Sequence, residues 1–379
     1  MKKTLSGILA IAGLLLVSCT KTPISSGEQA KNESDLGDNV QPTQKGVLTA
    51  SEWNDLNNWT FWNDLLAKKE YNKMPSYWGF YTANRVSVNA KDASGKVVVN
   101  MPVTLQMNGA DVFTARTDNQ GNVELWPTLF NNEACDKSQL KIKAGSVVID
   151  QVKLFNEGVN QIELPSSQEL NQIEVAFVMD ATGSMSDELD YLKTELKDVI
   201  NRVKQNNPTS EVRTSCMVYR DEDDEYLTRS SDFSNDASTT ISFLDKQTAG
   251  GGGDYPEAVH TALTKAVKEF SWNLQAKTKV MFFIMDAPPH YDNAVLTSIQ
   301  NAVTEAANKG IKLIPVAASG ADKDTEFALR FMGIATNGTY VFITNDSGIG
   351  KNHMAASVGS APVEYLNNLM VRLINKYSL

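Results

Sequence analysis

Residues 173–184 read IEVAFVMDATGS, and this stretch decides how the second half of the chain folds. The apolar run 173–179 predicts a strand that is buried on both faces, as in a parallel sheet. Apolar residues at helical spacing follow from residue 189 to residue 203. Strand, short polar loop and helix in this order make up the unit of an open α/β sheet, in which ligands bind beyond the carboxyl ends of the strands.

The loop after this strand offers only oxygen donors, namely the carboxylate of Asp180 and the hydroxyls of Thr182 and Ser184. Gly183, between the two hydroxyls, permits a tight turn. Oxygen donors without Cys or His suit Mg²⁺, Ca²⁺ or Mn²⁺ better than zinc or copper. The pattern therefore predicts a divalent-cation site, with Mg²⁺ as the first choice and Ca²⁺ or Mn²⁺ as alternatives.

The Asp-x-Thr-x-Ser pattern at residues 180–184 resembles the metal-ion-dependent adhesion site of von Willebrand factor A domains. Three later stretches follow in the same order: YRD at 219–221, GGGGDYPE at 250–257 and MDAPPH at 285–290. Together they are similar to the branch that includes the A domains of some bacterial proteins and of alpha-kinases. The resemblance runs from about residue 172 to the C-terminus and implies that Asp286 carries the last metal motif.

Asp254 stands where the best-known members of that family use threonine. We expect Asp254 to join Asp180, Thr182, Ser184 and Asp286 as a metal ligand. A carboxylate at that position would tighten cation binding and weaken the gain from an acidic partner. The alternative is a metal-free A domain that binds through its loops. The acidic run 221–225 is either a further contributor or a solvated loop, and we favour the loop.

Alternating strand and helix patterns continue to the C-terminus, so residues 170–379 are expected to form a doubly wound α/β domain with a mostly parallel sheet. Residues 229–233 are expected to supply an antiparallel edge strand. Residues 80–166 alternate with period two between turn signals, which predicts an all-β antiparallel sandwich. VNMPVTL at 99–105 and TDNQGNV at 117–123 resemble carboxypeptidase regulatory-like and bacterial Ig-like domains.

The N-terminus indicates export. Residues 1–18 form a basic and then apolar signal peptide, and LVSC at 16–19 resembles a bacterial lipobox, which implies cleavage before Cys19 and lipid on that cysteine. An ordinary secretory signal with a chance cysteine is the alternative. The polar stretch 19–48 predicts a flexible tether. We therefore expect a lipoprotein of the bacterial cell envelope, on the outer membrane, with its periplasmic or surface orientation left open.

Residues 49–79 hold four of the six tryptophans and are expected to be a helical segment, because TASE at 49–52 matches a capping box. The tryptophans either bind a sugar or peptide or dock the segment on a neighbouring domain, and docking is the interpretation that we favour. Cys135 and Cys216 are expected to be buried free thiols.

The net charge of −10 argues against nucleic acid as a partner. The hypothesis that follows is a lipid-anchored envelope protein whose A domain binds a divalent cation and, through it, a protein ligand that presents an acidic or other oxygen donor. We expect no catalytic activity. The alternatives are a metal-assisted hydrolase that uses His290 as a base and a purely structural envelope scaffold.

Overall fold

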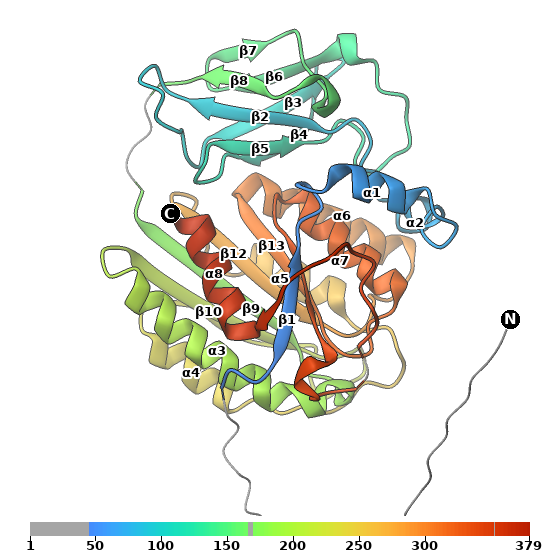
Figure 1. Ribbon diagram of the computed structural model, residues 1–379, viewed down its shortest axis with the longest axis vertical. Coiled ribbons are helices and arrows are strands. Elements are labelled where there is room, and N and C mark those ends of the chain that lie inside the picture. The colour runs from blue at the N-terminus through green and yellow to red at the C-terminus, as the bar shows by residue number, and fades with distance from the viewer. Residues whose placement is uncertain (1–44, 166–169, 352) are drawn as a thin grey trace, which may run out of the picture. The chain divides into compact units, whose positions relative to one another are not determined.

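The run at 173–179 forms a strand inside an eight-stranded mixed sheet (Figure 1). The computed structural model describes residues 45–165, 170–351 and 353–379. The strands of this sheet are β1 (Thr49–Trp53), β9 (Gln172–Asp180), β10 (Glu211–Tyr219), β11 (Thr228–Ser234), β12 (Thr278–Met285), β13 (Ile311–Ala317), β14 (Tyr340–Ile343) and β15 (Val363–Tyr365). Across the sheet they follow the order β11–β10–β9–β12–β13–β14–β1–β15.

The centre of the sheet is parallel, as the sequence predicts. β10, β9, β12, β13 and β14 pair in parallel with their neighbours in that order. β11 pairs antiparallel with β10, which confirms the antiparallel edge strand expected at residues 229–233. The carboxyl ends of β9, β10 and β12 therefore lie next to one another at one edge of the sheet.

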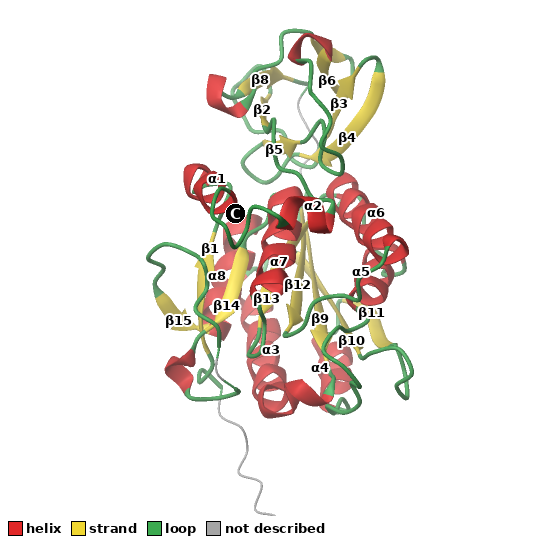
Figure 2. Ribbon diagram, turned by 90° about the vertical axis from the view of Figure 1, so that its right-hand side faces the viewer, coloured by secondary structure: helices red, strands yellow, loops and turns green. Residues whose placement is uncertain are grey.

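Helices cover both faces of the sheet (Figure 2). Their bounds are α3 (Ser186–Asn206), α4 (Ala237–Asp245), α5 (Val259–Lys268), α6 (Asn293–Lys309), α7 (Lys323–Ala335) and α8 (Leu366–Ser378). Alternate residues of β9 contribute to two separate apolar clusters. Val175 and Phe177 join α3, α4 and α8, whereas Ala176 and Val178 join α5, α6 and α7. β9 is thus buried on both faces, and its side chains point alternately into the two helical layers, as a doubly wound fold requires.

The prediction of a helix that begins at residue 49 is wrong, because Thr49–Trp53 forms the strand β1. β1 pairs antiparallel with both β14 and β15, and Ala50 faces Ile343 on one side and Glu364 on the other. A capping box is a local signal, and two ladders of backbone hydrogen bonds outweigh it. The sheet thus includes one strand, β1, from outside residues 170–379. The residues between β1 and β9 form an insertion between two strands of this sheet.

The segment before β1 is also held in place, which differs from the tether expected up to residue 48. The carboxylate of Glu195, fully buried in α3, accepts hydrogen bonds from the backbone N–H groups of Gly46 (3.0 Å) and Val47 (2.9 Å). Lys45 binds Asp198 at 2.8 Å. Residues 45–47 are therefore held against α3 and lead directly into β1.

Two smaller sheets lie in the insertion. Their strands are β2 (Val86–Lys91), β3 (Pro102–Met107), β4 (Ala110–Arg116), β5 (Asn122–Leu125), β6 (Leu140–Ala144), β7 (Val147–Ile149) and β8 (Asn160–Glu163). They form a three-stranded sheet, β5–β2–β8, and a four-stranded sheet, β4–β3–β6–β7. All pairs are antiparallel except β2 with β8. The antiparallel sandwich expected here is thus confirmed only in part.

The tryptophans of residues 49–79 pack inward, beside the short helices α1 (Trp59–Leu66) and α2 (Met74–Trp78). Trp62 and Trp78 are fully buried. Trp62 stacks on Phe327 of α7 with ring centroids 5.8 Å apart, and its Nε1 donates a hydrogen bond to the hydroxyl of Thr82 at 2.8 Å. The docking interpretation of this segment is therefore confirmed, since these rings supply packing area.

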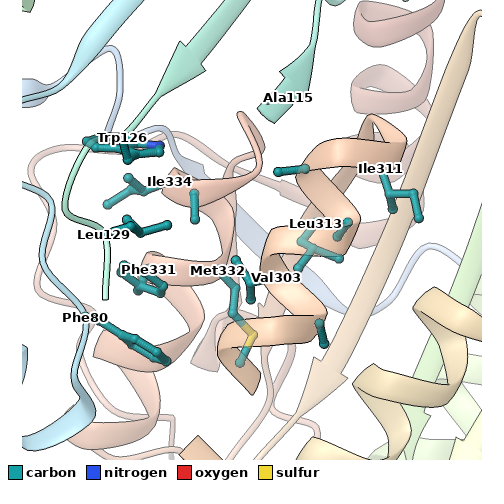
Figure 3. Close-up of a cluster of buried hydrophobic side chains, with 14 of the residues drawn as sticks. Phe80, Ala115, Trp126, Leu129, Val303, Ile311, Leu313, Phe331, Met332 and Ile334 are labelled. Carbon is teal, nitrogen blue, oxygen red and sulfur yellow. The ribbon is translucent and has the colours of Figure 1, made fainter. Parts of the chain in front are cut away.

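The same apolar cluster continues from the small sheets to α7. Phe80 stacks on Phe331 with ring centroids 3.9 Å apart. Figure 3 shows the neighbouring side chains that complete the cluster, among them Trp126, Leu129, Met332 and Ile334. Residues 43–379 accordingly form one compact unit.

The two cysteines within the described ranges are both free. Cys216 is buried as expected, but Cys135 is only half-buried. Among the described residues, no helix combines the length and the apolarity that a membrane crossing requires. The predicted signal peptide, Cys19 and most of the predicted tether lie outside the described residues.

Candidate metal centre

The loop after β9 lies between the end of β10 and the glycine-rich loop at 250–253, and backbone hydrogen bonds hold these three segments together. Ala181 N–H donates to the Tyr219 carbonyl (2.9 Å), Gly250 N–H donates to the Ala181 carbonyl (3.0 Å), and Gly183 N–H donates to the Gly251 carbonyl (3.1 Å). The buried Arg220 adds a bond from its Nε to the carbonyl of Ala181 at 3.1 Å. The loops therefore form a fixed platform for the side chains that they carry.

Asp180 is fully buried at the end of β9. Its Oδ1 accepts hydrogen bonds from the backbone N–H of Thr182 (2.8 Å) and from the Thr182 hydroxyl (2.7 Å). That hydroxyl lies 3.1 Å from Oγ of Ser184. The Oδ2 atom of Asp180 has no hydrogen-bond partner within the described ranges. A buried carboxylate oxygen without a partner is costly, and a bound cation would relieve that cost.

Asp286 follows β12 and is also buried, and its Oδ1 lacks a hydrogen-bond partner in the described part of the chain. A cavity of about 160 Å³ borders Asp286 together with Ser184, Asp254 and Glu257. Of the five predicted ligands, Ser184, Asp254 and Asp286 thus line the cavity, whereas Asp180 and Thr182 are linked to Ser184 through the Thr182 hydroxyl.

Glu257 is the site residue that the sequence reasoning missed. Its side chain is buried, and its Oε2 has no hydrogen-bond partner among the residues described. Its backbone N–H donates to the Pro288 carbonyl at 3.0 Å, which joins the glycine-rich loop to the loop after β12. The sequence signal for this residue is the glutamate of GGGGDYPE, three residues after Asp254.

The carboxylates at this site perturb one another. Burial raises the pKa of Asp180 to about 7, and the neighbouring Asp286 contributes to that rise. Burial, followed by Asp180, Asp221 and Asp286, raises the pKa of Glu257 to about 9. Burial also raises the pKa of Asp286. A divalent cation would favour the ionised form of all three groups, so these carboxylates are suited to bind one.

Asp254 lies on the exposed rim of the cavity. One of its carboxylate oxygens lies within 4.8 Å of ligand atoms of both Asp221 and His290. Asp221 is buried, and its Oδ1 is 2.7 Å from Nε2 of His290. The structure therefore groups Asp254 with Asp221 and His290, as well as placing it beside Ser184 and Asp286.

The residues of the acidic run 221–225, after β10, differ in their solvent exposure. Glu222, Asp223 and Glu225 are exposed, as expected of a solvated loop. Asp224, in contrast, accepts hydrogen bonds from the backbone N–H groups of Gly252 (2.9 Å) and Asp221 (3.0 Å). The run thus fixes the glycine-rich loop beside the site.

A glycine at position 251 is required by this contact. Gly251 has a φ of +77°, and a Cβ there would lie 2.1 Å from Oδ1 of Asp224. No other residue avoids both the strained backbone and the clash.

Residues 174–330 match the family model of the von Willebrand factor A domain. They form a von Willebrand factor A domain. The match spans the ends of β9 and β12, so all the candidate ligands of the A domain lie inside it. The predicted family is therefore confirmed for this part of the chain.

Two curated relatives match part of the chain. A putative ariadne-like RING finger protein of Acanthamoeba polyphaga mimivirus is 30% identical over 119 residues, which are 31% of this chain and 11% of that protein. The alpha-protein kinase vwkA of Dictyostelium discoideum is 28% identical over 120 residues, 31% of this chain and 19% of the kinase. The chain thus matches only a small part of either relative.

Among solved structures, the conserved hypothetical protein BatB from Bacteroides thetaiotaomicron is similar at 14% identity and a TM-score of 0.37. The similarity covers 54% of this chain and 98% of that protein.

Proposed function

We propose that the A domain binds a divalent cation at Asp180, Thr182, Ser184, Asp254 and Asp286 and uses that cation to bind a protein ligand. The observation that carries this proposal is the pair of buried carboxylate oxygens, Asp180 Oδ2 and Asp286 Oδ1, which have no partner within the described residues. A domains commonly bind a divalent metal and often mediate protein–protein interactions, which supports both parts of the proposal.

The donor set favours Mg²⁺. It combines carboxylates with the neutral hydroxyls of Thr182 and Ser184, and hard divalent cations prefer such oxygen ligands. The cavity of about 160 Å³ has room for an ion with several waters, since each water takes about 30 Å³. Glu257 adds a carboxylate on the inner side of the cavity, and Asp254 adds one at its rim.

The partner would replace one of these waters with an oxygen of its own. A carboxylate or another oxygen donor on the ligand would then complete the coordination of the cation. Tyr255 lies at the rim of the cavity, is 44% exposed, and donates from its hydroxyl to the Gly320 carbonyl at 3.0 Å. An aromatic side chain that is fixed in this way and still exposed is suited to contact a protein ligand.

We further propose that lipid on Cys19 holds the protein on a membrane of the bacterial envelope. The chain between that anchor and residue 45 would act as a tether that leads into the sheet at β1, and residues 80–166 would act as an Ig-like or carboxypeptidase regulatory-like interaction module. This arrangement would present the metal-binding edge of the sheet to partners in the envelope.

The experiment is capture from an envelope extract on the immobilised protein, with Mg²⁺ or with a chelator. A captured protein is identified, purified and then titrated against the A domain. We expect binding that requires Mg²⁺ and is lost in Asp180→Asn. Glu222→Gln is the matched control, because it removes one carboxylate from the exposed loop of the same edge. The proposal would be rejected if the affinity for the captured protein changed neither with the chelator nor with Asp180→Asn.

A metal-assisted hydrolase remains the second candidate because of one contact. Nε2 of His290 lies 2.7 Å from Oδ1 of Asp221, and a carboxylate that orients an imidazole is the arrangement of a general base. Turnover of generic ester or phosphoester substrates that disappears in His290→Gln would establish this function. Absence of turnover in the cation-loaded protein leaves ligand binding as the function.

A further inference from the structure

We propose that the side chains of Lys279 and Asn100 form an intramolecular amide bond that joins the A domain to the insertion between β1 and β9. Lys279 is the second residue of β12, and Asn100 lies in the loop between β2 and β3. Nζ of Lys279 donates a hydrogen bond to Oδ1 of Asn100 at 3.1 Å, and the two residues are 179 positions apart in the chain. Because Lys279 lies at the amino end of β12 and Asp286 follows its carboxyl end, this bond does not depend on the metal site.

The two reacting groups are close together and shielded from solvent. Lys279 is 3% exposed and Asn100 is 7% exposed. Because an amide C=O bond is about 1.2 Å long, Nζ lies no more than about 4.3 Å from Cγ of Asn100, the carbon that it would attack. A small movement of the lysine side chain brings the two atoms to a reactive separation of roughly 3 to 3.5 Å. Burial also excludes the water that would compete with the amine.

Neighbouring groups hold Asn100 in one orientation. Its Nδ2 donates to the Leu274 carbonyl at 2.6 Å, while its Oδ1 accepts from Lys279. Its backbone carbonyl accepts a hydrogen bond from Nη1 of Arg116 at 2.9 Å. The φ of Asn100 is +60°, in the left-handed region that asparagine adopts more readily than most residues. The amide is therefore fixed, and only the lysine side chain has to move.

The surroundings of Lys279 favour the neutral amine, which is the form that attacks a carbonyl carbon. Among the described residues, Nζ has two hydrogen-bond acceptors, Oδ1 of Asn100 and the Ala276 carbonyl at 2.9 Å. An ammonium group has three N–H donors, whereas a neutral amine has two and a lone pair. Burial and the neighbouring Arg116 lower the pKa of Lys279 to about 7, although Glu174 acts in the opposite direction. At pH 8 most of the amine is therefore unprotonated.

Glu174 lies beside Lys279 and supplies a group that transfers the proton. The two residues pair directly between the parallel strands β9 and β12, and Glu174 is fully buried. Burial raises the pKa of Glu174 to about 7. A carboxyl group with this pKa can both accept and release a proton near neutral pH.

The reaction balances without a co-reactant. The lone pair of Nζ forms a bond to Cγ of Asn100, and the electron pair of the carbonyl group moves to Oδ1. The carbonyl then re-forms, and the bond from Cγ to Nδ2 breaks with its electron pair. Glu174 takes the proton that Nζ loses and delivers one to Nδ2, which leaves as ammonia. One C–N bond forms, one C–N bond breaks, and nothing is oxidised or reduced.

The structure also has space for the leaving group. A cavity that borders both Asn100 and Lys279 has room for one molecule of about the size of water, and ammonia is similarly small. The amide bond would close a loop of 179 residues between the insertion and β12. A cross-link that closes a long loop lowers the entropy of the unfolded chain, so the bond would stabilise the attachment of the insertion to the A domain.

The test is peptide mapping of the full chain by mass spectrometry, after incubation at pH 8 and protease digestion under denaturing conditions. We expect the peptides that contain Asn100 and Lys279 to appear as one species, whose mass is the sum of the two minus one ammonia. Lys279→Arg should give two separate peptides, because a guanidinium group is not nucleophilic at this pH. Lys312→Arg is the matched control, since Lys312 is also buried but donates to the Asn337 carbonyl at 3.0 Å, and it should keep the linked species.

Glu174→Gln should lower the fraction of linked chain, and an unchanged fraction would remove Glu174 from the reaction. The wild type alone decides the main question, even if a variant does not fold. Two separate peptides in the wild-type digest would overturn the amide bond and leave Lys279 as a hydrogen-bond donor between the insertion and β12. A linked species that persists in Lys279→Arg would overturn it as well.

Discussion

Replacing Asp180 with Asn is expected to stabilise the cation-free protein at pH 8 while abolishing its response to Mg²⁺. Asp180 is fully buried at the end of β9. Asn has nearly the same shape as Asp, and its amide oxygen can still accept the two hydrogen bonds that Thr182 donates to Oδ1. The substitution therefore removes a buried charge without removing the contacts that hold the loop.

The magnitude follows from the pKa of Asp180. Burial and the neighbouring Asp286 raise this pKa from 3.8 to about 7. A change of that size corresponds to about 4 kcal/mol of unfolding free energy. Because the folded-state pKa is raised, this stability is fully present below pH 3.8 and is lost as the pH rises through about 7. At pH 8 the ionised Asp180 thus destabilises the cation-free protein by up to about 4 kcal/mol.

The assay is thermal unfolding in a chelator at pH 5 and pH 8, repeated with Mg²⁺. At pH 8 in the chelator, Asp180→Asn should unfold several degrees above the wild type, and the difference should shrink at pH 5. Mg²⁺ at a hundredfold excess over its Kd should stabilise the wild type by about 2.7 kcal/mol and the variant not at all. Glu222→Gln serves as the control for the loss of one surface carboxylate.

The reasoning would be refuted by an Asp180→Asn protein that melts below the wild type at pH 8 in the chelator and is still stabilised by Mg²⁺. That result would mean that Asp180 is a structural carboxylate and that any cation binds elsewhere.

Three further predictions concern affinity, anchoring and folding. Because ligand carboxylates must be deprotonated, Mg²⁺ affinity measured by calorimetry should fall about tenfold per pH unit below the pKa of about 7 of Asp180. Glu257, whose pKa is about 9, should release a proton on binding at pH 8, and a flat pH profile would contradict both statements. Cys19→Ala should move the protein from the membrane fraction to the soluble fraction, because the substitution removes the predicted site of lipidation. Unchanged fractionation would contradict the lipoprotein hypothesis. A fragment that begins at residue 167 should show no cooperative thermal unfolding, because it lacks β1, which lies between β14 and β15. The longer fragment 43–379 should unfold cooperatively. Cooperative unfolding of the short fragment would show that the fold does not need β1.

The sequence predicts the A domain well because its signals are local. Each parallel strand is a short apolar run followed by a helical pattern, and the candidate ligands Asp180 and Asp286 come where two such runs end. Neighbouring parallel strands place their carboxyl ends at one edge, so the meeting of these side chains follows from the topology.

β1 could not be predicted in this way. Its partners, β14 and β15, lie about 300 residues away in the chain, as the pairing of Ala50 with Ile343 and with Glu364 shows. Nothing in the local pattern of residues 49–53 encodes that pairing, and the capping-box pattern favours a helix. The pairing of a strand with a distant part of the sheet depends on the whole fold.

The sequence predicts the loop that carries Asp180, Thr182 and Ser184 but not the inward position of Glu257. The position of Glu257 depends on the turn made by Gly251 and Gly252, both with positive φ, and on the hydrogen bond to Pro288. These features send Glu257 inward and leave Asp254 on the rim. A motif gives the order of such residues but not the direction in which a glycine-rich loop turns.

The central claim is that a divalent cation binds in the cavity that Ser184, Asp254 and Asp286 line, beside Asp180, and the most direct test is a crystal structure of the protein with Mn²⁺. Anomalous scattering locates the ion without reference to any partner or activity. We predict a peak in that cavity within about 2.6 Å of the Ser184 hydroxyl and of a carboxylate oxygen of Asp286. A well-ordered cavity with no anomalous peak at saturating Mn²⁺ would contradict the account.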